Sequence, residues 1–451
     1  MRNILTALVL FYIKFWAKVA LIVNKPITVG IAGSVGKSST RNALYAALAG
    51  FKKTKVVTGN SETGLPLGIL GIEMQNYGIL NWLAVVASVP FRIFSTLGFK
   101  QMIVEMGIDD PHPPKNMEYL LSIIKPDVAV SLNVTATHTM QFGKLLKNKP
   151  EGISEEEFLL EAIAAEDSKI ITESFPRAGI YNADDKYLSR VLKDFDKTKL
   201  LTFGKEQNNN IVYKDYSVET DGTSFTFGAN EQKVTFNFKG SVLPQVYQAV
   251  FAPVILAAQV LGMNLNEIKE ALEKNFSLPK GRASIFAGIR KTLIIDSSYN
   301  ASKSSVLAFL ELLSELARKD KRETAFLMGD MRELGELVES EHKQVANEIN
   351  KTVDYLYCVG PLTYEYVIPH INQTKVKMVK WFETSREAAN YLEKNIPENT
   401  LLLVKGSQNN IFLEEAVKKL LADSQDSGKL CRQNSYWKKI KKRFFEGQVR
   451  A

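Results

Sequence analysis

The stretch TVGIAGSVGKSST, residues 28–40, joins an apolar run to a cluster of small residues and one lysine. A strand that ends in small residues and runs into a helix directs several backbone N–H groups at one point, so such a loop attracts phosphate. We expect Lys37 to contact the outer phosphates and the Ser38 hydroxyl to complete the shell of a Mg²⁺ ion that bridges them. The candidate phosphate-binding residues are Gly33, Ser34, Val35, Gly36, Lys37, Ser38 and Ser39.

The strict spacing of a phosphate-binding loop, G-x-x-x-x-G-K-[ST], is not met, because Ile31 occupies the place of the first glycine. The alternative interpretation is a glycine-rich turn between a strand and a helix, with a chance lysine. An apolar strand precedes the loop and the helix-compatible run RNALYAALA follows it. We therefore favour the nucleotide-binding interpretation.

Three more polar side chains follow apolar runs in the first half of the chain. Glu105 follows MIV, His138 lies in SLNVTATHTMQFG, and Asn182 lies in YNADD. Open parallel sheets bind ligands at the carboxyl ends of their strands, so Glu105 could reach a metal and Asn182 could read a base edge. The alternatives are a surface charge for Glu105, a structural role for His138 and a turn position for Asn182.

Short β-rich runs alternate with helical patterns, which predicts βαβ units on a parallel sheet. In the first half these runs are KVVTG, QMIVEMG, DVAVSLNV, SKIITES and AGIYNADD. Residues 211–239 alternate apolar and polar around turn pairs, as antiparallel strands do. A second rhythm begins near residue 283, with KTLIIDSS, ETAFLMGD, VDYLYCVG, KMVKWF and TLLLVKG. The predicted fold class is therefore α/β, a P-loop domain with a parallel sheet plus a Rossmann-like domain.

The composition, 45% hydrophobic over 451 residues, supports two or three domains with their own cores and excludes disorder for most of the chain. The two cysteines, Cys358 and Cys431, form neither a disulfide framework nor a metal cluster. A reducing, cytoplasmic location follows as the default expectation.

Residues 4–23 are apolar except for Lys14 and Lys18, which fall on one helical face. Two lysines near the middle of a membrane span are costly, so we expect a helix that lies in the membrane interface or packs on the protein. A second apolar stretch, residues 79–99, is interrupted by Pro90 and Arg92. We interpret this stretch as an amphipathic or substrate-facing element; a packed core helix is an alternative that the sequence supports equally well.

Most of the net charge of +8 lies at the carboxyl end, where residues 428–450 carry eight Lys or Arg and one Glu. This basic tail could be a solvated or self-packing helix, a membrane contact or a nucleic-acid contact. No other basic stripe supports nucleic acid, so we expect none. The expected protein is a cytoplasmic monomer with peripheral contact to the inner face of the membrane.

Nine motifs follow one another along residues 28–410: GIAGSVGKSST, TGNSETGLPLGIL, VEMGIDDPHPP, KPDVAVSLNVTATHTMQFG, YNADD, PKGR, IIDSSYNASKSS, LMGDMRELGE and LLVKGSQNN. In this order they resemble the Mur ligase family, and most closely its branch that adds D-alanyl-D-alanine. The resemblance implies ATP-dependent amide bond formation, in which a carboxylate attacks the γ-phosphate and an amine captures the acyl phosphate. The implied substrates are a small-molecule or lipid-linked cell-wall precursor and an amino acid or dipeptide.

The resemblance also assigns roles. It implies that Lys37 contacts the outer phosphates of ATP, that Ser38 and Glu105 hold one Mg²⁺, and that His138 helps to hold a second. Residues of the second domain would close over the nucleotide or the incoming amine and exclude water. These residues are Arg282, Asp296, Tyr299, Asn300 and Lys405.

One further role rests on a residue count. Most Mur ligases place a lysine, carbamylated by CO₂, about sixteen residues before the N-A-D motif, and its carboxylate supports the second Mg²⁺. Counting back sixteen from Asn182 gives Glu166, which would supply a permanent carboxylate. The alternative is a solvent-facing helix charge beside Asp167, or a slip of the count onto Lys169.

Several positions depart from the family pattern. Only 27 residues precede Thr28, so the grip on a uridine-nucleotide substrate is unaccounted for. The adenosine-seating segment, the D-D-S-Y-N-A-N-P motif and the arginine after K-G-S are all altered. The residues at these departures are Pro244, Gln248, Ser297, Lys303 and Gln408.

Two functions therefore remain open, an amide ligase and a nucleotide-binding scaffold that has lost ligation. The predicted organisation is a hydrophobic helix over residues 1–27, an ATP-binding domain over 28–280, a Rossmann-like domain over 281–424 and the basic tail over 425–451.

Overall fold

The computed structural model describes residues 2–74, 78–135, 139–229, 232–332, 334–408 and 410–447. The chain forms two compact units. Unit 1 comprises Met1–Asp215, Phe225–Phe236 and Gln248–Phe276, and unit 2 comprises Tyr216–Ser224, Asn237–Tyr247 and Ser277–Ala451.

The first sheet has nine strands in the order β2-β3-β1-β4-β5-β6-β7-β8-β9. The pairs from β2 to β7 run parallel, as a βαβ arrangement requires. Only two residues separate β7 from β8, which makes these neighbours an antiparallel hairpin. The strands are β1 (Ile27–Ala32), β2 (Thr54–Val56), β3 (Gln101–Glu105), β4 (Val128–Ser131), β5 (Ala178–Asn182), β6 (Leu200–Gly204), β7 (Ile211–Glu219), β8 (Gly222–Ala229) and β9 (Gln232–Lys239).

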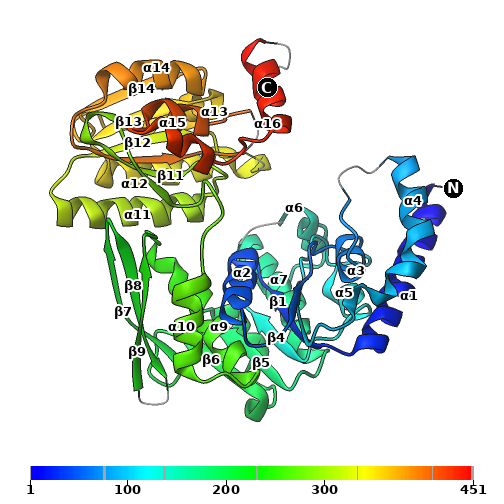
Figure 1. Cartoon of the computed structure of the whole chain (residues 1–451). Helices are drawn as coiled ribbons and strands as arrows, with labels where there is room; N and C mark the ends of the chain where they lie inside the picture. The colour runs from blue at the N-terminus through cyan, green and yellow to red at the C-terminus, as the bar shows by residue number, and fades with distance from the viewer. Residues whose placement is uncertain are drawn as a thin grey trace. The chain divides into compact units, whose positions relative to one another are not determined.

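Helices cover both faces of this sheet. One face carries α2, α9 and α10, and the other packs against α1, α3, α5 and α7 in one apolar core (Figure 1). The helices of this part are α1 (Arg2–Asn24), α2 (Lys37–Ala47), α3 (Gly64–Ile69), α4 (Ile79–Ser88), α5 (Met117–Leu121), α6 (Thr139–Phe142), α7 (Glu155–Thr172), α8 (Lys186–Leu192), α9 (Gln248–Val260) and α10 (Leu265–Asn275).

The run SKIITES was predicted as a strand and this prediction is wrong, because it forms the last turns of α7 and the residues beyond it. The Ser154 side chain caps the helix and three glutamates occupy its first turn, which favours a helical start. Its β-branched residues indicated a strand, but Ile170 and Ile171 continue the helix's buried stripe in the core of unit 1.

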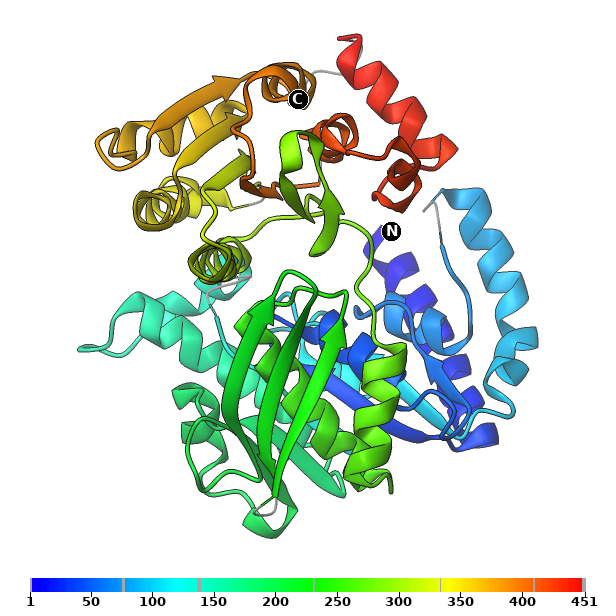
Figure 2. The same ribbon diagram turned by 60° about the vertical axis from the view of Figure 1, so that its left-hand side comes forward.

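The second sheet has six strands in the order β10-β11-β15-β12-β13-β14, all parallel except the edge strand β10. Helices α11 and α12 pack on one face and α14 and α15 on the other, which is a doubly wound arrangement (Figure 2). The strands are β10 (Ser284–Ala287), β11 (Leu293–Ser297), β12 (Thr324–Gly329), β13 (Tyr355–Val359), β14 (Met378–Phe382) and β15 (Leu401–Lys405). The helices are α11 (Lys303–Asp320), α12 (Val338–Thr352), α13 (Pro361–Tyr366), α14 (Ser385–Asn395), α15 (Glu414–Leu420) and α16 (Ser435–Phe445). The α/β fold class predicted from the sequence is confirmed.

The basic tail forms the self-packing helix that was one of its three interpretations. Phe412 makes ring contacts with three aromatic residues of α16, Trp437, Phe444 and Phe445. The Lys441 side chain is 5% exposed and pairs with carboxylates of α15. The tail is thus part of unit 2.

Candidate functional site

The glycine-rich loop lies between the carboxyl end of β1 and the start of α2, as predicted. Gly33 and Gly36 have φ of 129° and 94°, conformations that side chains rarely allow. A Cβ on Gly33 would lie 3.0 Å from the Cβ of Leu132, so this position also requires a close backbone approach. No side chain caps α2, which leaves its first-turn N–H groups for an anion.

The loop is tied to the neighbouring strand by hydrogen bonds. The Ser34 N–H donates to the Asn133 carbonyl at 2.9 Å, and the Val35 N–H donates to the Asn133 side-chain oxygen at 3.0 Å. The Thr135 N–H donates to the Ser34 hydroxyl at 3.0 Å. The segment after β4 therefore shapes the loop, a role that sequence reasoning did not assign to Asn133.

The Lys37 ammonium donates to the Gly33 carbonyl and, at 3.2 Å, to the Ser34 carbonyl. Both partners are loop carbonyls that water or another acceptor could replace. Lys37 is only partly buried, so its side chain has room to move from these oxygens to a phosphate.

Glu105 ends β3, directly beside β1, and faces the start of α2. The Ser38 hydroxyl donates to Glu105 Oε2 at 3.1 Å, and the Arg41 guanidinium lies 2.8 Å from Glu105 Oε1. The side chain of Glu105 is 5% exposed, so burial and these two partners fix its position. The structure thus brings together Lys37, Ser38 and Glu105, all predicted from the sequence.

Asp167 of α7 is a buried carboxylate that faces the same loop, and sequence reasoning missed it. Within the described part of the chain, neither of its oxygens has a partner in hydrogen-bond geometry. Burial raises the pKa of Asp167 to about 7, while the nearby Lys37 ammonium and Gly33 N–H act to lower it. The available signal was an acidic residue on the apolar stripe of an amphipathic helix, since Asp167 follows Ile163 and Ala164 and precedes Ile171 on that face.

Glu166 is also buried, but its oxygens are engaged elsewhere. The Met117 N–H donates to Oε1 at 2.7 Å, at the start of α5, and the Lys169 ammonium lies 2.8 Å from Oε2. Glu166 is therefore not the solvent-facing charge that was the alternative. Its support of a second Mg²⁺ stays a prediction.

The remaining predicted residues of unit 1 divide into two cases. Asn182 ends β5, and its side-chain oxygen accepts from the Asp184 N–H at 3.1 Å, which is a turn contact. His138 lies outside the described residues. Its predicted role at a second Mg²⁺ stays a prediction.

Unit 2 gathers its predicted residues at the carboxyl ends of β11 and β15, which are adjacent and parallel. The Lys405 ammonium donates to the Ser297 hydroxyl at 3.1 Å and to the Asn300 carbonyl at 2.9 Å. Burial, and secondarily the Arg282 charge, lowers the pKa of Lys405 to about 7. Lys405 is therefore poised between its charged and neutral forms near neutral pH.

Asp296, Arg282, Tyr299 and Asn300 complete this group. Burial raises the pKa of Asp296 to about 6, against the lowering effect of the Ser298 hydrogen bonds. The Arg282 guanidinium lies over the Tyr299 ring at 4.8 Å. The exposed Asn300 has its side-chain oxygen bonded to the Ala301 N–H. The Arg282 cation, the buried Asp296 carboxyl and the Lys405 amine, whose pKa is lowered, thus lie near the carboxyl ends of β11 and β15.

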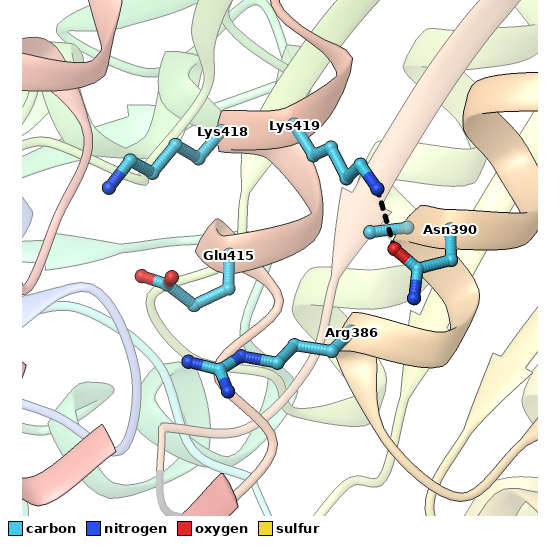
Figure 3. Close-up of a pocket in the computed structure, with 6 residues that line it drawn as sticks. Arg386, Asn390, Glu415, Lys418 and Lys419 are labelled. Atoms are coloured by element: carbon cyan, nitrogen blue, oxygen red, sulfur yellow. Dashed lines mark hydrogen bonds between the residues drawn. The ribbon is translucent and has the colours of Figure 1, made fainter. Parts of the chain in front are cut away.

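Unit 2 also has two surface hollows. The first contains none of the predicted site residues, and the second includes Tyr299. One, of about 410 Å³, lies between α14 and α15 and is lined by Arg386, Asn390, Glu415, Lys418 and Lys419 (Figure 3). The Lys419 ammonium donates to the Asn390 side-chain oxygen at 2.6 Å, a hydrogen bond that is drawn as a dashed line in Figure 3. The other, of about 680 Å³, is lined in part by Tyr299, Ser427, Gly428 and residues 430–434.

The oxygen donors at the loop fit Mg²⁺. This ion prefers oxygen ligands and keeps several waters, so it needs only one or two protein groups together with phosphate. Among the described residues no three His, Cys, Asp or Glu side chains gather as a protein-only cage. Ser38 and Glu105, which share a hydrogen bond, would hold the ion, which would neutralise phosphate charge there.

Comparison with known proteins agrees with this arrangement. Residues 281–408 match the Mur ligase, glutamate ligase domain. The UDP-N-acetylmuramoyl-tripeptide--D-alanyl-D-alanine ligase of Borreliella burgdorferi is 27% identical over 391 residues, 85% of this chain and 72% of that protein. The ligase of the same name from Bacillus subtilis is 24% identical, over 87% of this chain and 75% of its own.

Solved structures show the same fold. MurF from Acinetobacter baumannii superposes with a TM-score of 0.70 at 19% identity, covering 91% of this chain and 80% of its own. MurF ligase from Thermotoga maritima in complex with ADP gives 0.69 at 22% identity, covering 93% and 84%.

An α/β unit with a glycine-rich phosphate loop, followed by a Rossmann-like unit with a buried lysine at its strand ends, is thus an arrangement that this chain shares with ligases of the acid–amino-acid class. The chain is similar to Mur ligases over most of its length, and its residues 281–408 match their glutamate ligase domain.

Proposed function

We propose that the chain joins the carboxylate of a peptidoglycan precursor to an amino acid or dipeptide, with ATP as the driving substrate. The observation that carries this proposal is the convergence of Lys37, Ser38 and Glu105 on an uncapped helix start. Phosphoryl transfer needs alignment and charge neutralisation more than covalent chemistry, and these groups supply both. The names of the relatives point to D-alanyl-D-alanine as the amine and a UDP-linked tripeptide as the carboxylate.

In unit 1 the loop N–H groups and the α2 N-terminus would hold the phosphates, and Lys37 would exchange its loop carbonyls for phosphate oxygens. The substrate carboxylate would attack the γ-phosphorus, and the terminal P–O bond of ATP would break to give an acyl phosphate and ADP. The amine would then attack the acyl carbon, release phosphate and lose a proton. The Asp167 carboxylate, beside the Gly33 N–H, would disfavour a further negative charge at that end of the loop.

Lys405 and Asp296 would serve the second half of this reaction. An amine nucleophile must lose a proton during attack, and two groups with pKa near neutrality can accept or relay it. Arg282, held over Tyr299, would supply a fixed cation for a phosphate or carboxylate.

The decisive experiment measures phosphate release from ATP by the full chain with UDP-linked tripeptide and D-alanyl-D-alanine, added separately and together. Release that requires both substrates, with the amide product identified by mass, supports the proposal. Phosphate release that requires another pair of carboxylate and amine would assign different substrates to the same ligation reaction. Nucleotide binding without turnover on any pair would instead favour the scaffold that has lost ligation.

A further inference from the structure

The edge of unit 1 formed by α1, α4 and the following 3₁₀ segment (Val89–Thr96) exposes a continuous set of apolar side chains. We call it the outer apolar face. Each of its members is between 47% and 80% exposed. The members are Leu5, Leu8, Phe11, Phe15, Ile22, Leu83, Phe91, Phe94 and Leu97.

The opposite side of α1 is fully engaged with the protein. Leu10, Ile13, Ala17 and Ala20 are at most 8% exposed and belong to the core of unit 1. Their spacing of three, four and three residues makes them one helical stripe. Helix α1 therefore lies along the unit on this stripe and exposes Phe11 and Phe15 on its other side.

Hydrogen bonds join α1 to α4 and to the 3₁₀ segment, which carry the rest of the outer apolar face. The Tyr12 hydroxyl donates to the Val86 carbonyl at 3.1 Å, and the Thr96 hydroxyl donates to the Ala20 carbonyl at 3.2 Å. Both figures show α1 and α4 side by side (Figures 1 and 2). The two rows of apolar side chains thus form one preassembled surface.

By length and composition alone, Leu5–Asn24 could cross a membrane, but its contacts argue against a span. The Lys14 ammonium donates to the Ser122 hydroxyl at 2.5 Å and lies 4.9 Å from the centre of the Tyr119 ring. Crossing a bilayer would strip these partners and the inner stripe from α1. Only its outer half is available to lipid.

Charge on this edge has a single sign. Residues 1–61 and 74–104 contain no Asp or Glu. Exposed cations accompany the apolar side chains, among them Lys18, Lys25, Arg92 and Lys100. A second copy docked face to face would bring these cations together, which disfavours a dimer, whereas an anionic surface would pair with them.

We propose that the outer apolar face seats unit 1 in the headgroup and upper acyl region of an anionic bilayer, with α1 lying in the interface. Apolar side chains enter the lipid and the flanking cations meet its phosphates. The basic tail is a separate surface, because it belongs to unit 2 and its aromatic rings pack on Phe412. The proposal does not depend on ligation.

The test is flotation of the purified full chain with vesicles of phosphatidylcholine alone and of phosphatidylcholine mixed equally with phosphatidylglycerol. We expect binding to the anionic vesicles that weakens with salt. Phe11→Ser/Phe15→Ser and Phe91→Ser/Phe94→Ser should each lower the partition coefficient at least about tenfold. Because these side chains are exposed, the variants should keep wild-type melting temperature and nucleotide binding.

Matched controls locate the surface. Phe175→Ser removes a phenylalanine with the same 69% exposure as Phe11 from elsewhere in unit 1 and should leave binding unchanged. Lys18→Glu/Arg92→Glu should lower binding to anionic vesicles, and Lys438→Glu/Lys439→Glu in the tail should not.

Four outcomes would overturn the proposal. The wild-type chain could stay unbound at low salt, or lose binding only through the tail variant. It could also sediment as a dimer that the Phe11→Ser/Phe15→Ser variant converts to a monomer, which assigns the face to a second copy. In cells, retention of the chain in membranes after alkaline carbonate washing would indicate a spanning helix instead of an interfacial one.

Discussion

The Asp167 carboxylate beside the phosphate loop of unit 1 and the Arg432–Glu414 pair of unit 2 are both buried charged groups, yet they differ in how completely their charges are paired. Arg432 makes two hydrogen bonds to Glu414, at 2.9 and 2.7 Å, and two more to backbone carbonyls of residues 298 and 299. At the loop, no described residue meets Asp167 in full hydrogen-bond geometry, although the Lys37 ammonium and the Gly33 N–H lower its pKa, and Lys37 itself donates to loop carbonyls.

This difference separates architecture from function. A buried charge whose partners are complete contributes to the folded state and needs no ligand. A buried charged group without a full set of hydrogen-bond partners lowers stability. Such a group is retained at sites where a bound ligand supplies the missing partners. Variants in the two places should therefore affect stability and turnover in opposite proportions.

The largest expected effect is on turnover, from Lys37→Ala. Removing the only loop cation should lower ATP turnover about 100- to 1,000-fold, because phosphate charge is then less neutralised. The melting temperature should stay within a degree or two of wild type, since the side chain is partly exposed and packs little. Lys193→Ala, an exposed lysine of the same unit, is the control. Wild-type turnover in Lys37→Ala would remove the loop as the ATP site.

Arg432→Met should show the reverse balance. It leaves Glu414 buried with only the more distant Lys441, at 3.4 Å, so the free energy of unfolding should fall by about 3–5 kcal/mol. Lys291→Met, at an exposed ion pair with Glu398, should leave the unfolding curve close to that of wild type, because solvent screens this pair. Denaturant titration of both variants measures the contrast. Equal losses would show that Arg432 is no more structural than a surface charge.

Asp167→Asn should sharpen the contrast within one side chain. Turnover should fall about 10- to 100-fold, while the free energy of unfolding at pH 8 rises by about 1–3 kcal/mol as an uncompensated buried charge is removed. Glu166→Gln is the matched neighbour, and the Mg²⁺ dependence of turnover tells the two apart. A shift of half-saturating Mg²⁺ in Asp167→Asn alone would place Asp167 at the metal, and a shift in Glu166→Gln alone would place Glu166 there.

The sequence could predict the strand ends of both sheets because parallel strands carry long apolar runs and polar residues follow them directly. Glu105 and Lys405 illustrate this, since each ends a strand whose five residues are all buried. The segment SKIITES was misassigned because local β propensity competes with packing that only the folded unit supplies. Asp167 and Asn133 were missed because their importance lies in what faces them, which spacing along the chain does not encode.

The last expected effect is a pH dependence at Lys405, which changes stability gradually and leaves the fold intact. Burial lowers its pKa in the folded protein from the ordinary 10.5 to about 7, so the unfolded chain binds the extra proton between these values. Stability from this group is therefore lowest at pH 7 and below, and rises toward pH 10 by at most about 1.4 kcal/mol per pH unit. Lys405→Met has no such proton, and other titrating groups cancel when the two proteins are compared at each pH. The melting temperature of wild type minus that of Lys405→Met should therefore increase steadily from pH 7 to pH 9.5. A difference that stays flat would show that Lys405 keeps its charge when buried, held by Asp296 across the strand edge, and a permanently charged lysine would bind phosphate instead of relaying the proton of the amine.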